Sequence, residues 1–283
     1  MPARQSPTVR RRRLGMELRR FREAAGLTIE QVAERLECSH SKISRIETAH
    51  VSATPRDVRD MLEIYGVSGD QREALIQIAR EARQRGWWHA YGDVIKESAY
   101  VGLEVAAASI RSYGVILVPG LLQTTEYARA VARAVRPDLR PEQIERQVEL
   151  RMARQAILTQ DDPPALWAVV DEAVLRRSVG EHGVMGEQLR RLIEAAELPT
   201  VTLQVLPSAA GEHAGMDGAF TILSFPESAD RDVVYLENAT SDLYLESTEE
   251  IRRYTLLFDH LRAAALSPDD STALLTKLVK ELL

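Results

Sequence analysis

A short segment near the N-terminus carries side chains that can bind the phosphates and base edges of DNA. Hydroxyl, imidazole, ammonium and guanidinium donors occur together at His40, Ser41, Lys42, Ser44 and Arg45. Such donors bind phosphate oxygens, and arginine and lysine also bind guanine in the major groove. The chemistry expected of this segment is therefore recognition of a polyanion.

Local capping patterns predict the two helices that must position these donors. Thr28 followed by Gln31 forms a capping box, which satisfies free N–H groups at a helix start. Ser39 is a typical N-cap for a second helix, and only Glu37 and Cys38 separate the two. The segment 27–47 is thus predicted to be two short helices joined by a tight turn.

Apolar residues of the second helix indicate which face is buried. Ile43 and Ile46 are three residues apart, so they share one face, and the small Ala33 lets the two helix backbones approach closely. The donors are left on the outer face. A helical hairpin from a larger bundle, with a merely solvated outer face, is the alternative.

Flanking segments favour a compact bundle of about five short helices around this motif. Leu14, Leu18 and Phe21 predict an amphipathic helix that Gly26 ends, and Thr54-Pro55 begins another after the motif.

The segment resembles the Xre-type, lambda-repressor-like DNA-binding domain, in which the run Ile43–Glu47 recurs. Two positions depart from that family: Glu37 stands where glycine is usual in the turn, and Ile29 where glutamine is frequent. The resemblance implies a phosphate contact by Thr28. It also implies groove contacts by the donors of the second helix, namely His40, Ser41, Lys42, Ser44 and Arg45.

Charge is distributed unevenly along the chain. Residues 1–90 contain 17 Lys and Arg against 12 Asp and Glu, whereas the remainder contains 19 against 30. The overall charge of −6 hides this asymmetry, so only the N-terminal part should be drawn to a polyanion. The run Arg10–Arg13 is interpreted either as a DNA-tracking arm or as a solvated helix start.

Length and composition predict two domains in a cytoplasmic protein. A chain of 283 residues with 45% apolar composition can build two cores. The single cysteine, Cys38, suits a reducing compartment as a small packing residue. No signal peptide or membrane span is expected. The predicted division is a DNA-binding domain at 1–68, a connecting segment at 69–90 with a helix near 71–84, and a regulatory domain at 91–283.

The connecting segment ends in Trp87-Trp88. These rings are either a stacking platform for a ligand or apolar anchors at a domain junction, and we favour the anchors because aromatic rings bury much area without any ligand.

The C-terminal part is predicted to be an α+β domain with a mixed sheet, so that the whole chain is an all-α helix-turn-helix bundle followed by an α+β domain. Strands are expected at 107–113, 165–170, 201–206, 219–225, 233–237 and 243–246. Helices are expected at 125–135, from Pro141 onward, between 171 and 199, and after the caps Ser247 and Ser267.

No catalytic constellation is recognised, and an enzyme, a metal site or a cofactor is not expected. His182, His213 and His260 lack metal-ligand spacing, and the adjacent Asp171 and Glu172 should diverge. The glycine-rich loop 211–218 could approach an anion through its backbone, but a plain connection between strands is the favoured interpretation.

The C-terminal part also resembles the obscure domain that follows the helix-turn-helix in actinomycete regulators of the WhiJ type. The run 118–124 (VPGLLQT), the arginine-rich helix at 146–154 and the glycine-rich loop before Phe220 carry this resemblance. It implies a transcriptional regulator with a small partner protein in a toxin–antitoxin-like arrangement.

Two functions for the C-terminal domain stay open. It either dimerises the chain and docks a small protein partner, which we favour, or it senses a small molecule in a pocket near Trp167, Tyr235 and the loop 211–218.

Overall fold

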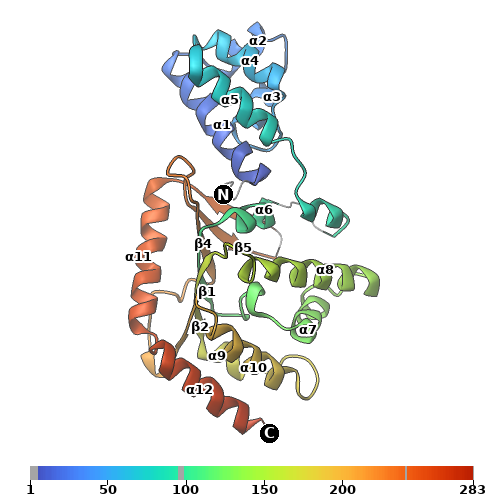
Figure 1. Cartoon of the computed structure of the whole chain (residues 1–283), viewed down its shortest axis with the longest axis vertical. Helices are drawn as coiled ribbons and strands as arrows, with labels where there is room; N and C mark the ends of the chain where they lie inside the picture. The colour runs from blue at the N-terminus through green and yellow to red at the C-terminus, as the bar shows by residue number, and fades with distance from the viewer. Residues whose placement is uncertain (1–5, 95–98, 240, 283) are drawn as a thin grey trace. The chain divides into compact units, whose positions relative to one another are not determined.

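The computed structural model describes residues 6–94, 99–239 and 241–282. The chain divides into two compact units (Figure 1). The first contains the described residues up to His89 together with Val101–Ala106 and Glu227–Asp230, and we call it the helical unit. The second contains the rest of the chain, and we call it the sheet unit.

Five α-helices build most of the helical unit. They are α1 (Pro7–Ala24), α2 (Ile29–Arg35), α3 (His40–Glu47), α4 (Pro55–Ile64) and α5 (Gly69–Glu81). The predicted capping boxes at Thr28 and Thr54 are both present, and Ser39 accepts a hydrogen bond from the N–H of Lys42. Gly26, with φ of 68°, follows the end of α1 as predicted.

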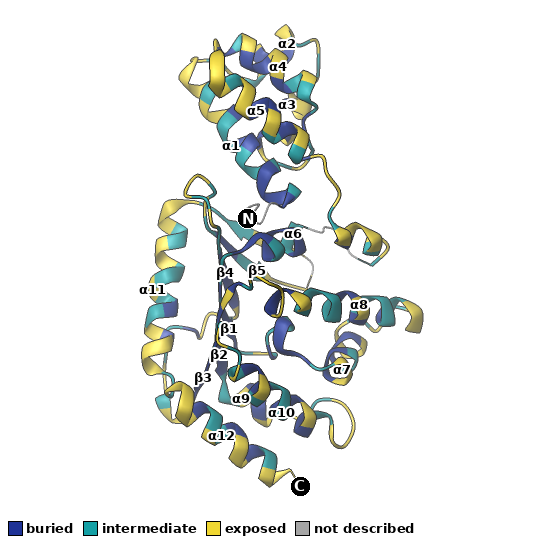
Figure 2. Ribbon diagram, viewed as in Figure 1, coloured by how far each residue is buried: buried dark blue, intermediate teal, exposed yellow. Residues whose placement is uncertain are grey.

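One apolar core joins these five helices (Figure 2). Leu18 of α1, Val32 of α2 and Ile43 of α3 are each at most 1% exposed. Leu75 and Ile76 of α5 belong to the same core, and Cys38 packs against it as a half-buried side chain. The bundle therefore holds α3 by its apolar face and leaves the opposite face outside.

The backbones of α1 and α3 approach each other at Gly15. A Cβ atom at this position would lie 2.6 Å from the carbonyl oxygen of Glu47 and 2.8 Å from that of Ile46. Real side chains do not tolerate such distances, so the helices can cross this closely because residue 15 has no side chain.

The arginine run lies within α1 and does not form an extended arm. Arg10 is 6% exposed and forms ion pairs with Glu227 at 2.7 Å and Glu81 at 3.2 Å, both in the helical unit. Arg13 pairs with the same Glu227 carboxylate. The prediction that this run belongs to the start of a helix is confirmed. Arg10, however, is buried beside acidic side chains and is not solvated.

Trp88 is an internal residue of the helical unit. It is 2% exposed within the 3-10 helix η1 (Trp87–Tyr91), and its ring fills the space that a side chain on Gly86 or Gly102 would need. Trp87 is 41% exposed. The burial of Trp88 makes that ring part of the packing of the helical unit.

The sheet unit is built on one six-stranded mixed sheet in the order β3-β2-β1-β4-β5-β6. Its strands are β1 (Ser109–Gly114), β2 (Ala165–Asp171), β3 (Val201–Leu206), β4 (Phe220–Ser224), β5 (Val233–Glu237) and β6 (Asp242–Leu245). Strand β2 pairs in parallel with β1 and with β3. Strand β4 pairs antiparallel with β1, β5 with β4, and β6 with β5. The predicted α+β domain with a mixed sheet is confirmed.

Helices cover both faces of this sheet. The helices of the unit are α7 (Thr125–Val135), α8 (Pro141–Arg154), α9 (Glu172–Arg176), α10 (Val184–Ala196), α11 (Thr248–Ala264) and α12 (Pro268–Glu281). Figure 1 shows α11 on one side of the strands and α7, α8 and α10 on the other. Short 3-10 helices lie at η2 (Gly120–Leu122), η3 (Gln155–Leu158) and η4 (Ser208–Ala210).

The motif 118–124 is a hydrogen-bonded junction. Gln188 of α10 is 0% exposed, accepts from the N–H of Thr124 at 2.8 Å and donates to the carbonyl of Leu122 at 2.8 Å. Gln155 donates to the carbonyl of Gln123 at 2.7 Å. These amide side chains fix the start of α7 against α10.

One helix was not predicted. The segment Ala99–Ala106 forms α6, although it is apolar almost all round and contains Gly102. Without alternating polar residues it lacks the amphipathic period that reveals a helix in sequence.

The two helical glycines at positions 15 and 186 should respond to alanine with opposite signs. Gly15→Ala should destabilise the helical unit by about 1–3 kcal/mol, because its Cβ would overlap backbone oxygens. In α10, Gly186→Ala should stabilise by about 0.5–1 kcal/mol, because the nearest atom to its Cβ is Arg190 Nη1 at 3.9 Å. Amide hydrogen exchange in each unit measures both effects, and a stable Gly15→Ala would contradict the close approach.

Candidate functional site

The outer face of α3 presents the donor side chains that the sequence singled out. His40, Ser41, Lys42 and Arg45 are exposed and Ser44 is half-buried, while Ile43 and Ile46 point into the core. The structure therefore brings all five predicted groove residues onto one helix. Thr28 is exposed at the start of α2, where its hydroxyl oxygen accepts from the N–H of Gln31.

An ion pair restrains Lys42. Its Nζ lies 2.6 Å from Asp57 Oδ1, at the start of α4. The hydrogen bond to Asp57 raises the pKa of Lys42. Burial by itself would raise the pKa of Asp57, but hydrogen bonds from Lys42 and Thr54 outweigh it and hold that pKa below its usual range. This tether to α4 could not be read from local sequence patterns.

Arg45 is unrestrained by comparison. Within the described residues its guanidinium forms no hydrogen bond or ion pair, and the side chain is exposed on the same helix. A guanidinium with all its donors available can bind two acceptors of one base at once. Arg45 thus differs from Lys42 in keeping its donors available on the exposed face of α3.

A buried ion pair fixes α3 against α1. Arg22 donates to both carboxylate oxygens of Glu47 at 2.7 and 2.9 Å, and it also donates to the carbonyl of Leu27 at 2.8 Å. The side chains are 10% and 3% exposed. Glu47 is the last residue of α3, so the pair orients the whole helix. Sequence reasoning missed this pair, since 25 residues separate its members.

The left-handed turn between α2 and α3 is present at Glu37. Its φ is 49°, a conformation that favours glycine. Glu37 therefore forms the turn between α2 and α3 at the conformational cost that a side chain brings to a left-handed residue.

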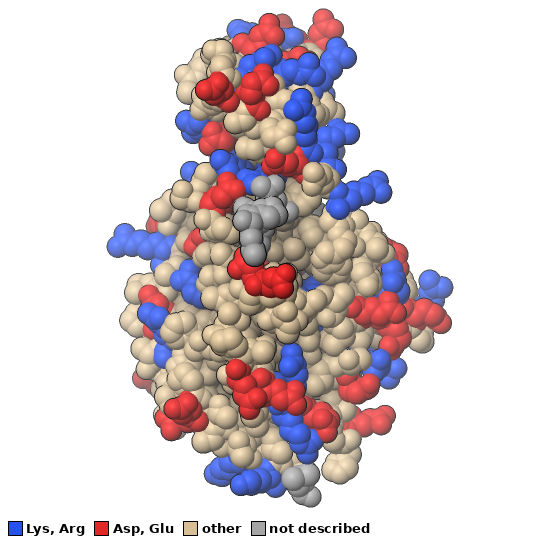
Figure 3. Space-filling view, in the orientation of Figure 1, with Lys and Arg blue, Asp and Glu red and all other residues tan. Residues whose placement is uncertain are grey.

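Charge on the helical unit is mixed over the face that Figure 3 shows. Lys and Arg side chains stand there among Asp and Glu. Electrostatic attraction to a polyanion then depends on particular exposed cations more than on a uniform positive patch.

The candidate residues of the sheet unit have structural partners. Asp171 caps α9 through the N–H of Ala173, whereas Glu172 accepts from the N–H of Ser208, so the two carboxylates diverge as predicted. In the loop 211–218, His213 Nδ1 accepts from the N–H of Gly215 at 3.1 Å. Gly215 itself lies against the ring of Tyr113, which closes the loop onto β1.

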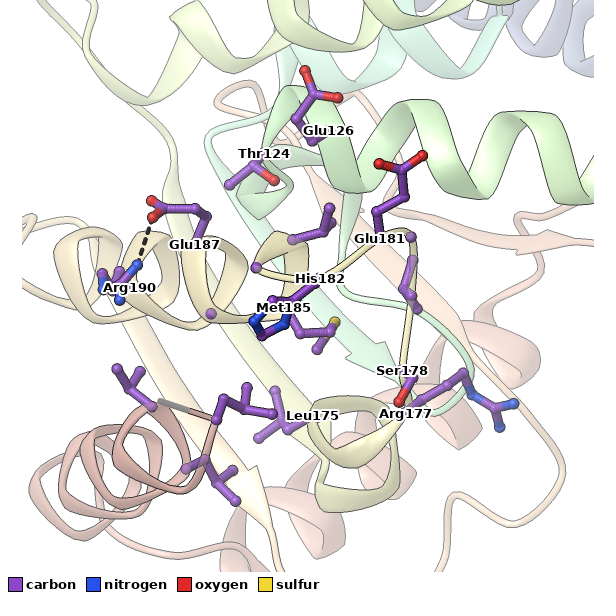
Figure 4. A pocket seen from close by; sticks show the side chains of 18 of the residues that line it. Thr124, Glu126, Leu175, Arg177, Ser178, Glu181, His182, Met185, Glu187 and Arg190 are labelled. Atoms are coloured by element: carbon purple, nitrogen blue, oxygen red, sulfur yellow. Dashed lines mark hydrogen bonds and ion pairs between the residues drawn. The ribbon is translucent and has the colours of Figure 1, made fainter.

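A cavity of about 1120 Å³ lies elsewhere in the sheet unit (Figure 4). The start of α7, the segment 175–183, the first turns of α10 and the end of α12 line it. Neither Trp167, Tyr235 nor the loop 211–218 is among its lining residues. The pocket that the sequence placed near those residues is therefore not this one.

Two further properties bear on function. None of the described helices has both the length and the apolar character needed to cross a membrane. Over the same described residues, no three His, Cys, Asp or Glu side chains gather as metal ligands would.

Comparison with known families finds two matches along the chain. Residues 13–75 match a family model described as a helix-turn-helix domain, which marks the chain as a DNA-binding regulator. Residues 98–277 match the model described as a domain of unknown function, DUF5753, and the chain belongs to this family. No curated protein and no solved structure matches the chain.

Removing the buried arginine should loosen α3. Arg22→Ala leaves the Glu47 carboxylate buried without its partner, and we expect a loss of about 3–5 kcal/mol in the free energy of unfolding. Native-state hydrogen exchange of the α3 amides measures it.

Arg19→Ala is the matched control. It breaks an α1 ion pair with Glu23 whose side chains are 61% and 52% exposed, and it should leave the free energy of unfolding nearly unchanged because solvent screens the pair. Equal losses for the two variants would contradict the role given to the buried pair.

Proposed function

We propose that this protein is a sequence-specific transcriptional regulator that binds duplex DNA as a homodimer through α3. One observation carries this proposal. The bundle holds α3 in place, and the exposed Arg45 on its outer face has no hydrogen bond or ion pair within the described residues. His40, Ser41, Lys42 and Ser44 complete the proposed groove contacts, and Thr28 the phosphate contact.

A dimer is proposed because one recognition helix covers too few base pairs for useful selectivity. The domain division proposed for this function is 1–68 for DNA binding, 69–90 for connection and 91–283 for regulation.

For the regulatory domain we propose docking of a small protein partner that alters DNA affinity. The resemblance to WhiJ-type regulators and the acidic balance of residues 91–283 support this. A small-molecule sensor is the second candidate, and the cavity between α7, α10 and α12 favours it.

Arg45→Ala should weaken binding to an operator selected from random duplexes by about 1–3 kcal/mol and should relax the base preference at one position. Lys42→Ala should cost less, because Asp57 already holds that ammonium at 2.6 Å. Gel-shift titrations with the whole chain over a salt series measure both losses.

Arg252→Ala, an exposed arginine on α11, is the control for total charge and should leave the base preference unchanged. Footprinting should show two protected half-sites about one helical turn apart. A single half-site occupied by a monomer, or an unchanged preference in Arg45→Ala, would contradict the proposal.

The docking proposal predicts reciprocal coupling between partner and operator. A partner, identified by native mass spectrometry of the complex from the source cell, should bind free protein and the protein–operator complex with different affinities. Calorimetric titration in both states tests this. Equal affinities would refute coupling by a docked partner and leave ligand sensing as the regulatory candidate.

A further inference from the structure

The cavity in the sheet unit has an apolar floor. Leu175, Met185 and Leu278 line it and are 2%, 7% and 4% exposed. They come from α9, α10 and α12, and Val184 and Val279 of the last two helices add to the apolar lining. Figure 4 shows His182 and Met185 near the middle of this pocket. An apolar floor of this kind accommodates the body of a hydrophobic small molecule.

A missing side chain leaves further space in the cavity wall. Gly186 is buried in the first turn of α10, yet the nearest atom to a Cβ at this position is Arg190 Nη1 at 3.9 Å. Glycine weakens a helix relative to alanine. Packing within the chain gives no reason for glycine here, and its presence keeps this part of the cavity empty.

Backbone hydrogen-bond donors lie in the same wall of the cavity, at the start of α10. The N-cap of α10 is Gly183, which has no side chain to accept hydrogen bonds from the first turn. Within the described residues the N–H groups of Met185 and Gly186 have no acceptor. Free N–H groups at a helix start favour an acceptor oxygen, most of all a charged one.

Most charges at the rim are already paired. Arg190 binds Glu187, Glu126 binds Arg129, and Arg176 binds Glu172. Arg177, Glu181 and His182 also line the cavity as exposed side chains, so the amide donors and the apolar floor select a ligand together with them.

We propose that this cavity binds a small, mainly apolar molecule that presents one acceptor oxygen, on a carboxylate or a ketone, to the amides of α10. The inference deepens the sensing candidate for the regulatory domain and rests on it. The ligand would contact α10 and α12 together.

Calorimetry of the whole chain with naphthoate and with acetylnaphthalene tests the proposal. Saturable binding of one molecule per chain is expected. Tighter binding of naphthoate assigns a carboxylate ligand, and equal binding assigns a neutral acceptor.

Gly186→Leu should place a side chain beside the α10 amides and weaken binding at least about tenfold without lowering the melting temperature, because the nearest side-chain atom to a Cβ at this position is 3.9 Å away. Gly186→Ala should weaken it less. Leu256→Ser changes a 58% exposed leucine on α11 outside the cavity, and it should leave binding unchanged.

Absence of saturable binding of both compounds, or equal binding by Gly186→Leu and the natural chain, would overturn the proposal. Operator binding is measured on the same samples. If the chain binds its operator but neither compound, only the ligand-binding proposal is refuted. If the chain binds a compound but no operator, the proposal of a DNA-binding regulator is refuted and the ligand-binding proposal stands.

Discussion

The close crossing of α1 and α3 is the constraint on which the position of the α3 donors depends. Gly15 lets the two backbones meet, and the Arg22–Glu47 pair then holds the end of α3 at a fixed orientation. A buried carboxylate is costly unless a partner neutralises it, so the pair favours one arrangement over looser ones. The donors on the opposite face of α3 are therefore presented by a rigid helix.

A comparable constraint organises the sheet unit. The amide of Gln188 satisfies two backbone groups at the start of α7, and burial makes each of those hydrogen bonds expensive to lose. The same junction places Thr124 beside the first turns of α10, where both line the cavity. Packing that stabilises the fold thus also shapes the wall of the cavity at the start of α10.

The sequence by itself determined several helix starts, most strand positions and the order of an all-α bundle before an α+β domain. Thr28, Ser39, Thr54 and Ser247 begin helices as predicted, because a cap satisfies N–H groups within its own turn. The outward donors of α3 were predictable for the same reason, since helical periodicity is local.

Tertiary structure alone decided what those elements contact. The Arg22–Glu47 and Lys42–Asp57 pairs join residues 25 and 15 positions apart, and no local period relates them. The cavity arises where residues of α7, α10 and α12 line one space, although they are far apart in the sequence. Burial, charge pairing and empty volume are properties of packed neighbours, and distant residues become neighbours through folding.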